Sequence, residues 1–214
     1  ALVLAATGDT PMGCYAELAG LRRAGELDAS RLRVAQLDEY LGLPDGDPRL
    51  LYGWMDRSLF APLEIGPERV VRFPSDNDDP ALACRAYDAQ IEAAGGVDLA
   101  ILGLGPNGHL GFNEPPSGPD AATRAISLTP ESLESNARYW TDTVPQRALT
   151  TGMSVIMAAR RVLLLVSGSR KASVLGRLIR SDRNPWLPAS HLHAHPAALL
   201  LADRAALPDG PPRA

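Results

Sequence analysis

A short apolar run that ends in a glycine-rich loop constrains the fold of this chain more than any other stretch. It lies in DLAILGLGPNGHLGFNEPPSG, residues 98–118. Leu99–Leu104 has the length and apolar character of a strand buried on both faces. Open α/β sheets bind ligands in loops at the carboxyl ends of such strands. The stretch therefore predicts a parallel strand and a site loop in which His109 and Glu114 are the polar candidates. A tight turn with a structural His109 is the alternative.

Short apolar strands alternate with helical segments along the whole chain. Further strands are expected at Leu2–Ala6, Leu32–Leu37, Val70–Phe73, Ala125–Leu128, Arg161–Val166 and Ala197–Ala202. Helical patterns cover Met12–Leu27, Ser58–Leu63, Pro80–Ala94, Gln146–Ala159, Pro188–His195, a turn from Thr129 to Tyr139, and a segment that opens at 167–171 and runs to about Arg180. This alternation predicts a three-layer α/β fold, with a mostly parallel, Rossmann-like sheet and helices on both faces. Without repeats or long linkers, residues 1–214 are expected to form a single domain.

Charge and composition exclude several classes of protein. The 214 residues carry a net charge of −4, so no global positive field recruits nucleic acid or a membrane surface. Cys14 and Cys84 lack the spacing of a metal site or a disulfide framework, which is typical of a reducing cytoplasm. No apolar run is long enough to span a bilayer, and no signal peptide is visible. Because the chain opens directly in a strand with Ala1, we expect its N-terminus to be truncated or incomplete.

Two further loops have the pattern of anion sites. Each follows an apolar strand, contains glycine and leads into a helix: one at Thr7–Thr10, the other at 167–171, SGSRK. Free N–H groups and the helix dipole favour an anion at such a turn. Thr10 suits the N-cap and Pro11 the first helical position. Lys171 opposes the dipole unless an anion is bound. A simple capped turn is an equally good interpretation of the first loop, and neither loop has a nucleotide-binding motif.

Two other groups of polar residues stand out. Asp38 and Glu39 directly follow the expected strand Leu32–Leu37, which places them on the ligand side of the sheet, although a solvated acidic pair is the alternative. His191, His193 and His195 alternate along a short helix, so their side chains diverge, and no carboxylate or cysteine stands at ligand spacing. We expect helix-end packing and capping there, and no metal site.

Taken together, the motifs resemble those of the glucosamine-6-phosphate deaminase family. They are ATGDTP at 6–11, LDEYLGLP at 37–44, GLGPNGHLGFNEPPSG at 103–118, SNAR at 135–138, ALTTGM at 148–153, SGSRKA at 167–172 and PASHLHAHP at 188–196. They follow the family's order over nearly the whole chain. The sister family of 6-phosphogluconolactonases is similar around Gly-His but typically continues without FNEP.

The resemblance implies the isomerisation and deamination of glucosamine 6-phosphate to fructose 6-phosphate and ammonia, without a cofactor. Asp38 matches the base that moves a proton between C1 and C2, and His109 the acid/base of ring opening. Glu114 would orient His109, and Asn107 stands where family members carry Asp or Asn. The implied phosphate ligands are the loop residues Thr7, Gly8, Asp9 and Thr10, together with Arg138 and Lys171. The partner is thus a small sugar phosphate, and a homo-oligomer is a possible assembly.

One departure from the family concerns regulation. Allosteric members bind their effector through Ser, Arg and Lys; Ser117 and Arg124 match two of these positions, but Ile126 replaces the lysine. We therefore expect a non-allosteric enzyme. Two alternatives to a deaminase stay open: a sugar-phosphate lactonase, which has no use for an isomerising base, and a sugar-phosphate sensor without turnover.

Overall fold

A parallel sheet forms the centre of the molecule in the computed structural model, which describes residues 1–140 and 143–208. Within these residues the sheet has six strands in the order β4-β2-β1-β5-β8-β9, and every neighbouring pair is parallel. The strands are β1 (Leu2–Ala5), β2 (Arg33–Gln36), β4 (Val70–Val71), β5 (Leu99–Gly103), β8 (Val162–Val166) and β9 (Ala198–Ala202). Leu4, Val34 and Leu102 have no exposed surface, which explains the continuous apolar runs of the inner strands.

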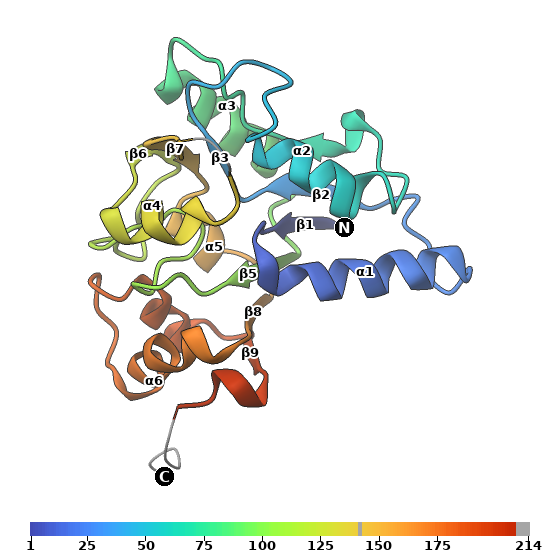
Figure 1. Ribbon diagram of the computed structural model, residues 1–214. Helices are drawn as coiled ribbons and strands as arrows, with labels where there is room; N and C mark the ends of the chain where they lie inside the picture. The colour runs from blue at the N-terminus through green and yellow to red at the C-terminus, as the bar shows by residue number, and fades with distance from the viewer. Residues whose placement is uncertain (141–142, 209–214) are drawn as a thin grey trace.

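Helices cover both faces of this sheet. On one face lie α1 (Asp9–Arg23) and α2 (Leu51–Met55), the latter continuing into a π-helical turn at Asp56–Phe60. On the other face lie α3 (Pro80–Ala93), α5 (Met153–Met157) and α6 (Ala172–Arg180). Figure 1 shows α1 running beside the strands. The predicted three-layer, mostly parallel α/β fold is therefore confirmed.

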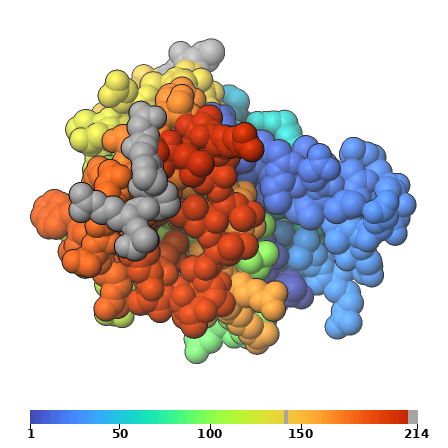
Figure 2. Space-filling view, turned by 90° about the horizontal axis from the view of Figure 1, so that it is seen from below, coloured from blue at the N-terminus to red at the C-terminus, as the bar shows by residue number. Residues whose placement is uncertain are grey.

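The edge strand β9 is less buried than its neighbours. Leu199, Leu200 and Leu201 are 56%, 38% and 49% exposed. Figure 2 shows that the C-terminal segments, in orange and red, form much of the face seen from below, beside N-terminal segments in blue. Among the described residues, no helix has the length and apolar character to cross a membrane.

A second, antiparallel sheet was not expected from the sequence. It consists of β3 (Asp38–Tyr40), β7 (Arg147–Thr150) and β6 (Arg124–Ser127), and lies near α4 (Pro130–Ala137) on the left of Figure 1. The predicted helix Gln146–Ala159 is therefore wrong over its first part, because β7 occupies 147–150 and only Met153–Met157 is helical. The fully buried Ala148 and Leu149 pack in the core, and pairing with strands on both sides satisfies the β7 backbone.

The start of α1 also differs from the expectation. The helix begins at Asp9, so Thr10 is not the N-cap and Pro11 is the third helical residue. Gly8 occupies the cap position with a φ of 94°, a conformation that favours glycine and lets the chain turn directly from the end of β1 into the helix. Short 3-10 turns lie at Pro67–Arg69, Ser169–Lys171, Pro188–Ala194 and Arg204–Ala206.

The order of the strands determines where a ligand fits. After β1 the chain adds β2 and then β4 toward one edge of the sheet. After β5 it adds β8 and then β9 toward the opposite edge. The direction of winding thus reverses between β1 and β5, and loops leaving adjacent strands in opposite directions open a crevice there. The loops after β1 and β5 are two of the three that the sequence singled out; the third, 167–171, follows β8.

Candidate active site

A pocket lies at the carboxyl ends of β1, β5 and β8. It brings together eight of the predicted site residues, which are Thr7, Gly8, Asp9, Thr10, Asp38, His109, Arg138 and Lys171. The two others, Asn107 and Glu114, stand behind His109 and contact it or each other. Segments that are far apart in the chain therefore build one site.

Asp38 lies at the point where the chain leaves the parallel sheet. After β2 the backbone bends at Leu37 and enters β3, which pairs with β7. Asp38 lines the pocket but is only 6% exposed, and its Oδ1 has no hydrogen-bond partner among the described residues. Burial, reinforced by the neighbouring charge of Glu39, raises the pKa of Asp38 to about 8. A carboxylate with this pKa can take up and return a proton near neutral pH.

Glu39 is a structural carboxylate, a role that sequence reasoning missed. It accepts hydrogen bonds from the Gln36 side chain at 2.8 Å and from the backbone N–H groups of Tyr40, Leu51 and Tyr52 at 2.8–2.9 Å. Burial raises the pKa of Glu39, while these donors oppose the shift. Glu39 thereby fixes the start of α2 against β3, directly beside Asp38. The signal available in the sequence was only its place next to Asp38.

His109 and Glu114 form a hydrogen-bonded pair. His109 Nδ1 lies 3.2 Å from Glu114 Oε2, and the two side chains are 13% and 3% exposed. Burial alone would raise the pKa of Glu114, but the hydrogen bond and charge of His109, together with Ser132 and Asn107, hold it at about 2. Glu114 is therefore ionised throughout the neutral range, and it orients the imidazole through Nδ1.

Three neutral side chains complete this pair. Asn107 Nδ2 donates to Glu114 Oε2 at 2.7 Å, and its Oδ1 accepts from the backbone N–H of His109 at 3.2 Å. Ser132 Oγ lies 3.2 Å from His109 Nδ1, and Thr129 Oγ1 donates to Glu114 at 3.3 Å. Ser132 and Thr129 were not predicted; the only sequence signal was Thr129 as the N-cap of α4, a role that it also fulfils.

The loop after β5 needs glycine where it meets His109. A Cβ atom on Gly105 would overlap the His109 ring, and Gly105 N donates to His109 O at 3.0 Å. The absence of a side chain at Gly105 therefore allows the loop to fold back on itself and hold the imidazole at the pocket wall.

The opposite end of the pocket is positively charged. The first turn of α1 and the 3-10 turn Ser169–Lys171 meet there, and Ser167 Oγ donates to Thr10 Oγ1 at 3.4 Å. Lys171 Nζ donates to the carbonyl of Leu104 at 2.6 Å, so the lysine stands between the loops after β8 and β5. Burial and the nearby Arg138 and Arg170 lower the pKa of Lys171, which a bound anion would reverse.

Arg138 reaches this end from the C-terminal side of α4. Its guanidinium lies over the Tyr139 ring, 4.5 Å from the centroid, and forms an ion pair with Asp9 at 3.1 Å. The Asp9 carboxylate itself cannot bind an anion, so only the main chain of Asp9 can serve in the predicted phosphate loop.

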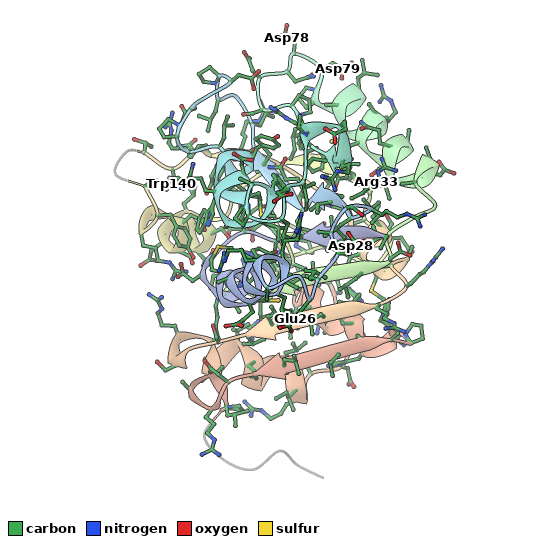
Figure 3. The ribbon with its side chains drawn as sticks, turned by 90° about the vertical axis from the view of Figure 1, so that its right-hand side faces the viewer. Glu26, Asp28, Arg33, Asp78, Asp79 and Trp140 are labelled. Carbon is green, nitrogen blue, oxygen red and sulfur yellow. The ribbon has the colours of Figure 1, made fainter. Side chains whose placement is uncertain are left out.

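Aromatic side chains close one side of the pocket. Tyr40, Trp54, Phe112 and Tyr139 line it, and Trp54 packs edge-on against Tyr139 with ring centroids 4.9 Å apart. Trp140 Nε1 donates to Tyr40 OH at 3.3 Å. In Figure 3 Trp140 and Arg33, the first residue of β2, lie on opposite sides of the molecule, which places this wall at the carboxyl end of the sheet.

The matched regulatory residues are engaged inside the protein. Arg124 Nη2 donates to Ser117 Oγ at 2.8 Å and its Nη1 to Asn113 Oδ1 at 2.9 Å, while Ile126 packs in the apolar cluster around Tyr40. This arrangement joins both ends of the 113–117 segment that carries Glu114.

The histidine run contributes to packing. His195 Nε2 lies 2.8 Å from Ala159 O, and its Nδ1 accepts from Ala197 N at 3.1 Å, whereas His191 is buried and His193 exposed. Across the described part of the chain, no group of three or more His, Cys, Asp or Glu side chains is arranged to hold a metal ion.

A crevice at the switch point, with a hydrogen-bonded His–Glu pair at one end and cations at the other, defines an α/β protein with a site suited to a small anionic ligand. Residues 1–201 match the family model described as "Glucosamine-6-phosphate isomerases/6-phosphogluconolactonase", and the chain belongs to this family.

Curated relatives of this chain carry the name glucosamine-6-phosphate deaminase. A glucosamine-6-phosphate deaminase of Halothermothrix orenii is 38% identical over 94% of this chain and 84% of its own length. One of Shewanella loihica is 40% identical over 94% of this chain and 76% of its own.

Solved structures show the same fold. A monomeric glucosamine-6-phosphate deaminase superposes with a TM-score of 0.93 at 36% identity, covering 96% of this chain and 86% of that one. A 6-phosphogluconolactonase of Thermotoga maritima has a TM-score of 0.75 at 21% identity, covering 94% and 84%. The second likeness concerns the fold alone.

Proposed function

We propose that this protein converts glucosamine 6-phosphate and water into fructose 6-phosphate and ammonia. The observation that carries the proposal is Asp38, a buried carboxyl group at the pocket wall whose Oδ1 has no protein partner within the described residues. An unpartnered buried carboxylate is costly to the fold, and proton transfer to a substrate accounts for its presence. The relatives that are 37–40% identical carry the name of this activity.

Ring opening comes first and belongs to His109. The anomeric hydroxyl must lose a proton and the ring oxygen must gain one to give the open-chain aldehyde. The imidazole lines the pocket through its outer edge, while its Nδ1 faces Glu114 and Ser132. Because Glu114 holds the imidazole in place through Nδ1, His109 can carry the proton between these two positions.

Isomerisation and deamination follow, with Asp38 as the base. Asp38 removes the proton from C2 of the open-chain aminoaldose while the aldehyde oxygen gains a proton, which gives an enolamine. Asp38 then returns a proton to C1, and the amino group loses the proton that balances the one gained by the oxygen. The product is an imine at C2, and its hydrolysis by water releases ammonia and leaves the ketose. Each proton that Asp38 takes up is given back, so no external acid or cofactor is needed for the balance.

The cationic end fixes the phosphate. Arg138 offers a bidentate guanidinium, Lys171 a point charge, and the Thr7–Thr10 loop the free N–H groups at the start of α1. Anchoring the phosphate there directs the sugar ring along the pocket toward Asp38 and His109.

The first test is ammonia release from glucosamine 6-phosphate. We expect turnover by the wild type, and a loss of about 10²- to 10⁴-fold in kcat for Asp38→Asn, the range for a general base. Asp76→Asn makes the same chemical change at an exposed position and serves as the control. A wild type that releases no ammonia would refute the proposal. Rapid lactone hydrolysis that Asp38→Asn leaves intact would identify a lactonase, and sugar-phosphate binding without any turnover a sensor.

Location and assembly are part of the proposal. Both cysteines are free, which suits the reducing cytoplasm in which we expect this reaction to take place. A homo-oligomer stays a prediction, while the relative with a TM-score of 0.93 is described as monomeric. Light scattering of the purified protein measures its state directly.

A further inference from the structure

A carboxylate stands inside the cationic end of the pocket. Asp9, in the first turn of α1, has its Oδ2 3.1 Å from Arg138 Nη2 and 4.0 Å from Arg170 Nη2. The Asp9 side chain is 57% exposed and free to move, whereas Arg138 is 32% exposed and is held against the Tyr139 ring. Arg170 is 75% exposed and lies at the rim.

Asp9 and a phosphate group would both pair with the guanidinium of Arg138. Both present oxygen acceptors to the guanidinium. Arg138 Nη2, which lies 3.1 Å from Asp9 Oδ2 and donates to Tyr139 OH, is among the nitrogens that a phosphate would contact. The Asp9 carboxylate also lies within the ring of residues that line the pocket, where it repels a dianion. Lys171, by contrast, is held by a neutral carbonyl and stays available to an anion.

We propose that Asp9 competes with the phosphate group of the substrate for Arg138 and so sets the KM of the enzyme. This proposal rests on the proposed function for the identity of the substrate, but not for the competition itself. Asp9 weakens the binding of every phosphate ligand by a similar factor, because the competition acts on the phosphate group that all of them share.

The size of the effect follows from the exposure of the pair. A partly exposed ion pair is weak, and salt screens it, so a dianion can displace it. Loss of the competition together with loss of the repulsion should tighten phosphate binding about three- to tenfold at low ionic strength. The gain should shrink in about 0.5 M salt, where the screening length falls to a few ångströms.

The experiment uses Asp9→Asn in the full chain, with inorganic phosphate as the probe and calorimetry as the readout. Glu17→Gln removes one negative charge from an exposed position of the same helix and is the matched control. Asp9→Ser, which keeps a polar oxygen at the helix start, is a second variant should Asp9→Asn fail to fold. We expect a three- to tenfold lower Kd for Asp9→Asn, a near-unchanged Kd for Glu17→Gln, and a parallel fall in the KM for glucosamine 6-phosphate.

The double variant isolates the pair. In an Arg138→Gln background, Asp9→Asn should gain clearly less affinity than in the wild type, because the competition is absent. An unchanged or weaker phosphate affinity in Asp9→Asn would overturn the proposal, as would an equal gain in Glu17→Gln, which would reflect net charge alone. If Asp9 only stabilised the start of α1, its replacement would lower the melting temperature without tightening phosphate binding.

The proposed function and the proposed role of Asp9 can be refuted independently of each other. Phosphate calorimetry needs no turnover, so a wild type without ammonia release would refute the proposed function while the affinities of Asp9→Asn still decide the competition. Normal turnover with unchanged affinities would refute only the role of Asp9.

Discussion

Two neighbouring acidic residues, Asp38 and Glu39, are both buried, but their hydrogen bonding differs. Glu39 accepts four hydrogen bonds and orders the start of α2. Asp38 faces the pocket with an oxygen that has no partner among the described residues. The charge of Glu39 adds to burial in raising the pKa of Asp38. Burial of this oxygen lowers the stability of the fold, and the role that we propose for Asp38 as the base accounts for it.

Asp38→Asn should make the protein more stable than the wild type, by an amount that grows as the pH rises. In the unfolded chain the carboxyl ionises at its ordinary pKa of 3.8, whereas in the fold its pKa is about 8. The free energy of unfolding is therefore highest, as far as Asp38 is concerned, below pH 3.8. It falls by about 1.4 kcal/mol per pH unit up to about pH 8 and is constant above that pH. The asparagine variant escapes this loss.

Denaturant unfolding of both proteins between pH 5 and 9 measures this difference. The gap in unfolding free energy between Asp38→Asn and the wild type should widen up to about pH 8, by several kcal/mol in all. A gap that stays constant over this range would contradict the raised pKa of Asp38.

At the scale of an element, the loop after β5 depends on the lack of a side chain at Gly105. Gly105→Ala places a methyl group where the His109 ring lies, so the imidazole must move away from Glu114. We expect kcat to fall about 10²-fold or more, because small displacements of an acid/base group cost this much. The change should show in the ammonia assay.

Gly118→Ala is the control for this loop. Its added Cβ would meet nothing within 4 Å, and it lies at the end of the same loop, outside the pocket. Its turnover and circular dichroism spectrum should match the wild type. Equal losses in both variants would show that the loop tolerates no substitution, and the specific role of Gly105 would be wrong.

The segment 146–159 shows where element prediction fails. Its composition favours a helix, and the last part, Met153–Met157, is one. The first part is a strand because β3 and β6 lie on either side and offer it backbone partners. Pairing with segments 20 or more residues away in sequence cannot be read from local periodicity.

At the scale of the whole molecule, the residues that match a regulatory site are used for internal contacts. Arg124 bonds to Ser117 and Asn113, and Ile126 adds apolar packing instead of a cation. An anionic effector would find one cation there, already engaged. We therefore expect hyperbolic saturation with a Hill coefficient near 1. A sigmoidal curve that an amino-sugar-phosphate activator renders hyperbolic would contradict this expectation, and steady-state kinetics decides between them.

The sequence by itself determined the fold class and supplied the candidate residues for the chemistry, whose roles stay predictions. Apolar runs such as Leu99–Leu104 have a period and length that only a buried parallel strand explains, and glycine, histidine and carboxylates in one loop mark a site. These signals are local, so they can be read from the sequence without knowing which residues are in contact. The family motifs then linked Asp38, Arg138 and Lys171 to this loop.

Only the tertiary structure decided what each of these side chains faces. It gave β7 its partners, buried Asp38 and so raised its pKa, and placed Ser132 and Thr129 behind His109. It also turned Asp9 toward Arg138. Such contacts join residues up to about 130 positions apart, and their energies depend on burial and distance, which the order of residues along a chain does not contain.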